Sequence, residues 1–347
     1  MSSPASLPAA ARWLFPVLAI AVAVVAPPLM NSDYLYEAIL LPFLALSLAG
    51  VGLNVLMGYT GQLSLGSAAF LAIGAYAAFN INLRVGLPLP VTIVAAGIIA
   101  ALVGVVFGLP SLRLRGYYLA VSTLAAQFFV QWALTRFPWF SNDSNSGVID
   151  APTLSVAGIH FVTPLGRYYF TLTIVALLTA LSARLVTVKT GRDLMAVRDH
   201  ETAAKIIGVP VLKAKLVAFA YSSFVIGVAG VLWAFAYLRT VEPDGFNLDR
   251  SFQILFITII GGLSTIRGAF FGAAIIVALP LLLARASSGL AGGALDSGSL
   301  DMIQRIVIGV LIIGFLIAEP DGLAALIQRA PNGLAGRVRP RSSPATR

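Results

Sequence analysis

The sequence lacks cysteine and contains only two histidines and few charged residues among its 347 positions. Without cysteine, the chain can form no disulfide, no thiolate nucleophile and no metal site with cysteine ligands. His160 and His200 lie far apart, each in a connection between apolar segments, so we expect no catalytic or metal-binding role for either. The chain also lacks a glycine-rich phosphate-binding loop. We therefore expect no metal, no cofactor and no ATP hydrolysis in this chain.

Apolar residues dominate what is present: 59% of the residues are hydrophobic, 11% are charged and the mean hydropathy is +0.92. A soluble domain of this size could not cover its surface with so few polar residues. About ten apolar runs, most of them roughly 18–25 residues long, match the length that a helix needs to cross about 30 Å of hydrocarbon. The sequence therefore predicts an all-α polytopic membrane protein with eight to ten transmembrane helices. The expected spans are 13–30, 36–56, 63–81, 89–109, 117–135, 168–186, 214–237, 251–265, 268–285 and 302–318.

Two parts of this prediction remain open. The run at 13–30 follows Arg12 and could be a cleaved signal peptide, although its length favours a retained span. The runs at 251–265 and 268–285 are short and could form a re-entrant hairpin instead of two full spans. Three glycines lie in or beside their junction: Gly261, Gly262 and Gly268.

Lysine and arginine are distributed unevenly between the two sides that these spans define. One side holds Arg12, Arg113, Arg115, Arg267, five residues of the connection at 187–213 and five arginines beyond residue 328, whereas the other holds Arg84, Arg136, Arg167, Arg239, Arg250 and Arg285. The positive-inside rule places the richer side in the cytoplasm, and with it both termini and residues 187–213. We expect an N-terminal cytoplasmic tail at 1–12, a transmembrane domain at 13–320 and a disordered cytoplasmic tail at 321–347. The net charge of +9 thus arises mostly from basic residues in the connections on the cytoplasmic side. Because these residues are spread over many connections, they argue against nucleic-acid binding.

The predicted spans are nearly free of charge, which argues against a proton- or ion-driven transporter and against an intramembrane enzyme. Gln127 and Gln131 lie on one face of a span and either bond neighbouring helices or line a polar route. Ser64 and Ser67 are further candidates for such a route. Small residues at helical spacing predict close packing of helices, and the glycines in this pattern are Gly104, Gly108, Gly268 and Gly272.

The connection at 187–213, here called the charged loop, carries basic and acidic side chains together. Thr190 to Asp193 fits a helix capping box, Gly208 suits the position after a helix, and Pro210 prevents continuation. We expect one helix of about 16 residues that ends at Ile207. A passive helix on the lipid surface is the alternative, but the mixed charges and small residues favour a docking surface. Its expected residues are Arg198, Glu201, Ala203, Ala204 and Gly208.

Several blocks of the sequence resemble a known family. Glu201-Thr-Ala-Ala204 followed by Gly208 is similar to the EAA-type loop of ABC-importer permeases, with Thr202 where that motif has alanine. The whole stretch from Gly191 to Lys215 resembles the version in branched-chain amino acid permeases. Further similar blocks are Gly58–Gly66 with Phe70 and Gly74–Tyr76, Leu112–Thr123, and Gly261–Leu263 with Gly268 and Gly272. The block at 112–123 indicates the M-type (LivM) subunit, and the resemblance covers about residues 40 to 320.

This resemblance implies an ABC importer permease bundle in the bacterial inner membrane, with the charged loop coupling it to an ATPase. It implies a heterodimer with an H-type permease, two cytoplasmic ABC ATPases that bind ATP and Mg, and a periplasmic substrate-binding protein. The implied cargo is leucine, isoleucine, valine or a related amino acid, carried by alternating access. Urea or short amides are the alternative within the family, and a secondary transporter or channel is the alternative outside it.

Overall fold

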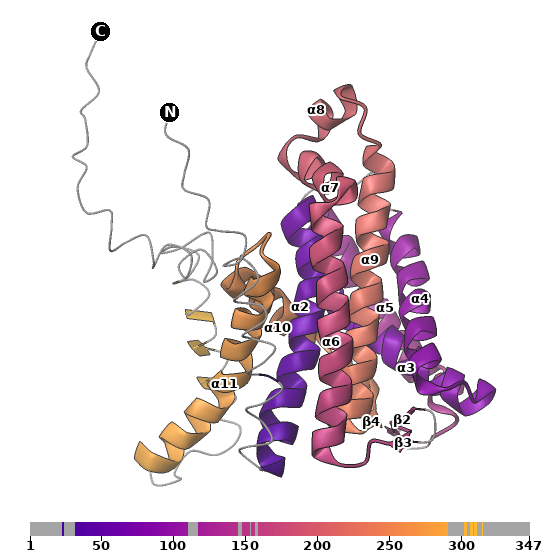
Figure 1. Cartoon of the computed structure of the whole chain (residues 1–347), viewed down its shortest axis with the longest axis vertical. Helices are drawn as coiled ribbons and strands as arrows, with labels where there is room; N and C mark the ends of the chain where they lie inside the picture. Colours follow the sequence, from indigo (N-terminus) through magenta and orange to yellow (C-terminus); the bar gives the residue numbers. More distant parts are fainter. Residues whose placement is uncertain are drawn as a thin grey trace.

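The computed structural model describes residues 32–109, 117–144, 148–152, 154–156 and 159–290, together with Ala23 and residues 302–303, 306–307, 309–310 and 314. These residues form a bundle of long helices, with short strands at one end and two small helices beyond the other (Figure 1). The helical elements are η1 (Leu35–Leu40), α2 (Leu41–Thr60), α3 (Ser67–Val85), α4 (Leu89–Gly108), α5 (Tyr117–Arg136), η3 (Pro138–Ser141), α6 (Pro164–Thr187), α7 (Lys189–Asp199), α8 (Glu201–Ile206), α9 (Val211–Leu232), η4 (Trp233–Leu238), η5 (Pro243–Phe246), α10 (Leu248–Gly261) and α11 (Ile266–Leu290). The strands β1 (Ile149–Asp150) and β4 (Thr240–Val241) pair antiparallel, as do β2 (Ser155–Val156) and β3 (Ile159–His160).

Six helical segments of the described chain are long and apolar enough to cross a membrane, which fits the predicted all-α membrane protein. They are Leu35–Thr60, Ser67–Val85, Leu89–Gly108, Pro164–Thr187, Val211–Leu238 and Ile266–Leu283. The predicted count of ten is not reached in this part of the chain. The span expected at 13–30 lies outside the described residues except for Ala23, and fewer than half of the positions in the span expected at 302–318 are described.

The other two predicted spans are not among these six, each for a different reason. α5 covers the run expected at 117–135, but polar residues such as Gln127 and Gln131 make it less apolar than the six. α10 has 14 residues, which corresponds to about 21 Å and falls short of the ~30 Å hydrocarbon layer. The pair α10–α11 is therefore a short helix followed by a helix of full length, so the length of α10 argues against two full spans, and the re-entrant hairpin stays a prediction.

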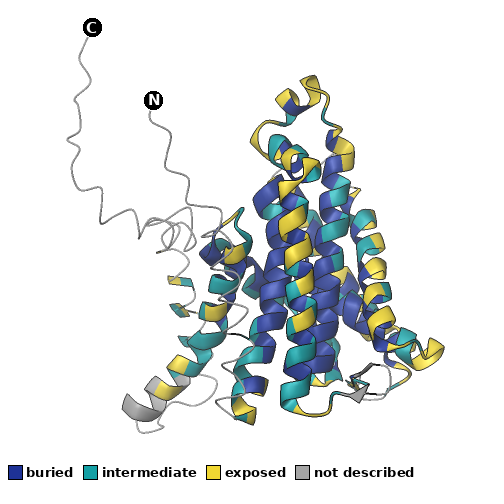
Figure 2. Ribbon diagram, viewed as in Figure 1, coloured by how far each residue is buried: buried dark blue, intermediate teal, exposed yellow. Residues whose placement is uncertain are grey.

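Helix α9 lies at the centre of the bundle and packs against α2, α3 and α4. Figure 2 shows that the buried residues concentrate in these inner helices. Close approach depends on small residues: a Cβ at Gly74 of α3 would collide with the backbone of Gly227, and one at Gly230 would collide with the backbone of Leu71. Lipid supplies no hydrophobic drive between helices, so such backbone contact is a main source of packing energy in membrane bundles.

The four glycines expected to pack helices all lie at helix contacts. A Cβ at Gly104 would collide with Ser223 of α9, and Gly108 faces Phe219 of the same helix. A Cβ at Gly268 would meet the carbonyl of Gly261, and one at Gly272 would meet the backbone of Ile257, so both lie where α11 meets α10.

Two irregular segments interrupt the bundle. Residues 61–66 connect α2 to α3, beginning at Gly61 with φ of 71°. Residues 239–247 connect η4 to α10 and contain β4 and η5. Irregular backbone at membrane depth is tolerated only where protein or a water-filled cavity satisfies its polar groups.

Candidate functional site

The charged loop folds into two helices, so the expected single helix of about 16 residues is wrong. α7 ends at Asp199 and α8 begins at Glu201, because His200 between them is extended at φ of −154° and ψ of 97°. The expected capping box is also wrong: the helix begins at Lys189, which places Thr190 inside its first turn. The expected end differs by one residue: α8 ends at Ile206 and Ile207 is its C-cap, while Gly208 lies just beyond the helix at φ of 84°, as the sequence predicts.

One side of the two helices packs on the bundle. Leu194, Val197 and Ala204 are buried and belong to one apolar cluster. Its members from the bundle include Val55 and Tyr59 of α2, Val186 of α6, and Val211 and Phe219 of α9. Ala204 thus faces this chain's own helices, whereas the sequence predicts it in the docking surface.

The opposite side of α8 is exposed and carries apolar residues at its tip. Ile206 and Ile207 are 81% and 73% exposed, and Ala203 and Gly208 beside them are exposed as well. The sequence singles out Ile207 only as the last residue of the expected helix, and it predicts no role for Ile206. The signal that could have identified this tip is the position of Ile206, which lies two residues after Ala204 and therefore about 200° around the helix from it.

Glu201 ties α8 to the start of α9. Its carboxylate accepts a hydrogen bond from Lys215 Nζ at 3.0 Å and lies 3.3 Å from Lys205 Nζ. The Lys215 side chain is 9% exposed, whereas the Lys205 side chain is 56% exposed. The pair with Lys215 is therefore the less screened of the two.

Arg198 ties α7 to two other elements. One guanidinium nitrogen donates to the carbonyl of Gly58 at 3.1 Å and to Ser264 Oγ at 2.7 Å. Gly58 lies near the end of α2, and Ser264 lies in the turn between α10 and α11. Asp199 pairs with the same guanidinium at 2.8 Å. The Arg198 side chain also covers Gly61, where α2 ends.

Asn54 of α2 holds the α10–α11 turn from the other side. Its amide donates to the carbonyls of Gly262 and Thr265 at 3.3 and 2.9 Å, and its Oδ1 accepts from the Ser264 N–H at 2.9 Å. Ser264 Oγ donates to the Gly58 carbonyl at 2.7 Å. A Cβ at position 58 would collide with both Asn54 and Ser264, so glycine is required there. Asn54, Gly58, Arg198 and Ser264 are called the junction below.

Gln127 lies in a buried polar cluster inside the bundle. Its amide donates to the carbonyl of Phe246 at 2.9 Å, and its Oε1 accepts from Ser251 Oγ at 3.2 Å. Ser251 Oγ in turn accepts from the Ala68 N–H at 2.8 Å. Gln127 therefore joins α5 to the start of α10 and to the start of α3, which is the neighbour-bonding role that the sequence left open. Gln131, one turn further along α5, is half-buried.

Ser64 and Ser67 lie where the segment 61–66 meets α3. Thr123 Oγ1 of α5 accepts a hydrogen bond at 2.9 Å from a backbone N–H of this segment. Within the described residues, the hydroxyl of Ser67 and both polar atoms of the Gln62 side chain are buried without a hydrogen-bond partner. The region around 61–67 thus keeps unused hydrogen-bonding capacity beside the polar cluster.

These contacts define a class of protein: a membrane-spanning bundle with a folded polar loop bonded to its helix ends. Residues 35–316 match the family described as "Branched-chain amino acid transport system / permease component", and the chain belongs to this family. It is 30% identical over 345 residues to the high-affinity branched-chain amino acid transport system permease protein LivM of Escherichia coli K12, covering 92% of this chain and 77% of that protein.

Two further relatives show the range of the family. LivM of Salmonella typhimurium LT2 is 30% identical over 79% of this chain and 66% of its own length. The autoinducer 2 import system permease protein LsrC of Enterobacter sp. 638 is 28% identical over 56% of each chain. Within the family the chain is thus a LivM-type permease.

Proposed function

We propose that this chain is the M-type membrane subunit of an ATP-driven importer for branched-chain or related amino acids. Its 30% identity to a LivM protein over 92% of the chain supports this cargo. The resemblance to LsrC, a permease named for a different cargo, keeps urea, short amides and other small solutes as the alternative. In this proposal residues 13–320 form the permease domain of a multi-pass inner-membrane protein, with both termini and the charged loop in the cytoplasm.

The partners in this proposal are an H-type permease, two cytoplasmic ABC ATPases and a periplasmic substrate-binding protein. ATP and Mg are bound by the ATPases, and this chain binds neither. The exposed tip of α8 supports a docking role, because a partner that covered Ile206 and Ile207 would gain about 1.5–3 kcal/mol for each. Ala203 and Gly208 beside them are small enough to let such a partner approach closely.

The observation that carries the coupling mechanism is the reach of Arg198 to both Gly58 and Ser264. Through these bonds, a displacement of the charged loop acts on the end of α2 and on the α10–α11 turn. α2 leads directly into the segment 61–66, and α10 begins beside the polar cluster. The charged loop is thereby connected to the irregular segments 61–66 and 239–247. In this proposal these segments change conformation when the bundle switches between its two packings.

The polar route is proposed along the face formed by Ser64, Ser67, Gln127 and Gln131. The hydrogen bonds that Gln127 makes to Phe246 and Ser251 suit a state in which the polar route is closed. In this proposal the Gln127 side chain exchanges these partners for others when the route opens.

Transport in a purified system tests the function directly. The chain would be isolated with its bound subunits from native membranes and reconstituted in liposomes containing ATP, with uptake of labelled leucine compared with urea. ATP-dependent, competable leucine uptake with co-purified ATPases is the expected result. Uptake that persists without ATPase subunits would place the chain in the secondary-transporter class.

A further inference from the structure

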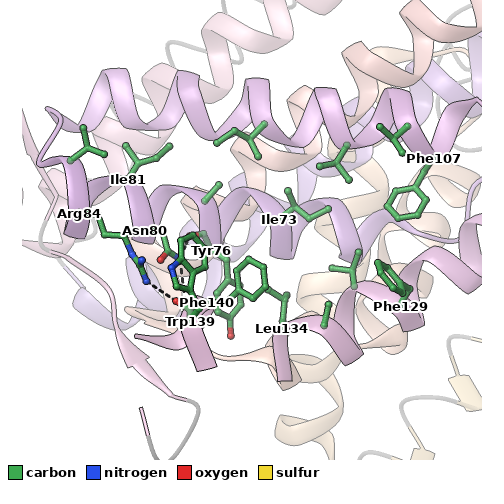
Figure 3. A pocket seen from close by; sticks show the side chains of 17 residues that line it. Ile73, Tyr76, Asn80, Ile81, Arg84, Phe107, Phe129, Leu134, Trp139 and Phe140 are labelled. Atoms are coloured by element: carbon green, nitrogen blue, oxygen red, sulfur yellow. Dashed lines mark hydrogen bonds between the residues drawn. The ribbon is translucent and has the colours of Figure 1, made fainter. Parts of the chain in front are cut away.

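A groove runs along the outside of the bundle between α4 and α5, with α3 as its floor (Figure 3). Both α4 and α5 pack on α3. The groove has a volume of about 560 Å³ and is lined mainly by aliphatic and aromatic side chains. Ile99, Val106 and Phe129 on its rims are 37%, 61% and 56% exposed, so it opens sideways, where a membrane would lie.

The length of the groove corresponds to one leaflet. Its lining residues on α3 extend from Ile73 to Val85, and twelve residues of helix are about 18 Å long. Half of a hydrocarbon layer of roughly 30 Å is about 15 Å. An acyl chain of one leaflet would therefore run along the groove from its mouth to the middle of the bilayer.

The mouth of the groove is basic and aromatic. Arg84 is the charged residue among the lining side chains, and its guanidinium lies 3.9 Å above the ring centre of Trp139. One N–H of Arg84 is donated to the Trp139 carbonyl at 2.8 Å, which leaves most of the five guanidinium donors for a ligand. Trp139 and Phe137 are about half exposed, and tryptophan in this setting is typical of the membrane–water interface.

We propose that this groove binds one phospholipid, with an acyl chain between α4 and α5 and an anionic headgroup on Arg84. A guanidinium binds phosphate oxygens through paired, charge-assisted hydrogen bonds, and a basic residue near the surface favours anionic lipid. A transmembrane helix of a second subunit is the rival occupant, and the effect of a groove-filling substitution on the association of the permease subunits separates the two.

Native mass spectrometry of the purified complex tests the proposal, with phosphatidylglycerol and phosphatidylcholine of identical acyl chains as probes. The unmodified complex should retain phosphatidylglycerol about fivefold more tightly, since one basic residue contributes on the order of a fivefold preference. Arg84→Gln should remove this preference and leave weak binding of both lipids. Ala133→Trp, which fills the groove from α5, should reduce the binding of both lipids at least tenfold.

The control is Leu177→Trp on α6, a 68% exposed position outside the groove, which should bind lipid like the unmodified complex. Equal lipid binding by Ala133→Trp and the control would overturn the proposal. Separation of the permease subunits by Ala133→Trp but not by the control would show that a helix occupies the groove and would also overturn it. If Ala133→Trp fails to fold, Ala77→Leu on the groove floor takes its place, and the outcome for Arg84→Gln decides the headgroup.

Discussion

At the residue scale, Arg198 and Glu201 lie three positions apart and hold the charged loop to different parts of the bundle. Arg198 bonds to the end of α2 and to the α10–α11 turn, whereas Glu201 bonds to Lys215 near the start of α9. Because the acceptor at Gly58 is a main-chain carbonyl, no substitution removes it. A substitution of Arg198 is therefore the way to break this hydrogen bond. The two residues can therefore be tested separately.

Arg198→Ala should weaken coupling while the complex still assembles. The variant loses hydrogen bonds to Gly58 and Ser264, and bonds of a charged donor contribute about 1.5–3 kcal/mol, although partial exposure lowers this. We expect a lower thermal midpoint and uptake reduced at least tenfold, with ATP hydrolysis retained. Arg192→Ala, an exposed arginine on the same helix, is the matched control. Normal uptake by Arg198→Ala would remove the junction from the mechanism.

Lys215→Met should cost more stability than Lys205→Met, because the Lys215 side chain is 9% exposed and the Lys205 side chain 56% exposed. The Lys205–Glu201 pair at i, i+4 contributes about 0.3–0.5 kcal/mol, and we expect at least twice that for Lys215. A double-mutant cycle with Glu201→Gln, followed by thermal unfolding at low and high salt, measures each coupling. Equal and strongly salt-dependent couplings would show that both pairs are surface pairs.

At the element scale, the break at His200 gives α7 and α8 different tasks. α7 buries Leu194 and Val197 and reaches the junction, and α8 buries Ala204 and presents Ala203, Ile206 and Ile207 outward. A single continuous helix could not fit both sets of contacts to the bundle. The tip is accordingly a separate exposed unit, held by Glu201 and by the positive φ of Gly208.

Ile206→Glu and Ala204→Trp should fail in different ways. Ile206→Glu changes an exposed side chain, so the folded complex should keep its thermal midpoint, while ATPase binding and uptake fall at least tenfold. Ala204→Trp overfills a buried site and should destabilise the chain itself by about 1–3 kcal/mol. Co-purification of ATPases and differential scanning fluorimetry separate the two effects. Full ATPase binding by Ile206→Glu would mean that the partner docks elsewhere.

The helices were predictable because the bilayer fixes both their length and their apolar character. The runs at 36–56 and 168–186 correspond to Leu35–Thr60 and Pro164–Thr187. The break at His200 was not predictable, since helix-forming residues continue on both sides of it and no glycine or proline marks it. The bonds of Asn54 to the α10–α11 turn join residues more than 200 positions apart, and no local pattern in the sequence specifies such a contact.

At the scale of the whole molecule, the bundle has two unlike ends. The charged loop lies beyond one end, and the paired strands β1–β4 and β2–β3 lie at the other (Figure 1). The end with the strands carries Arg84, Trp139 and the start of α6, where Arg167 pairs with Glu37. The proposed import direction requires the strand end to face the periplasm and the loop end to face the ATPases.

Cysteine labelling determines this orientation, because the chain contains no cysteine of its own. Val162→Cys and Ala203→Cys place single thiols at opposite ends of the bundle, and both positions are exposed. An impermeant maleimide added to intact cells with a permeabilised outer membrane should label position 162 and leave position 203 unlabelled, since positive-inside topology places the charged loop in the cytoplasm. After the inner membrane is opened, both thiols should react, which shows that position 203 is not merely covered by an ATPase. Labelling of position 203 in intact cells would reverse the topology, and the charged loop could then not be the contact for a cytoplasmic ATPase.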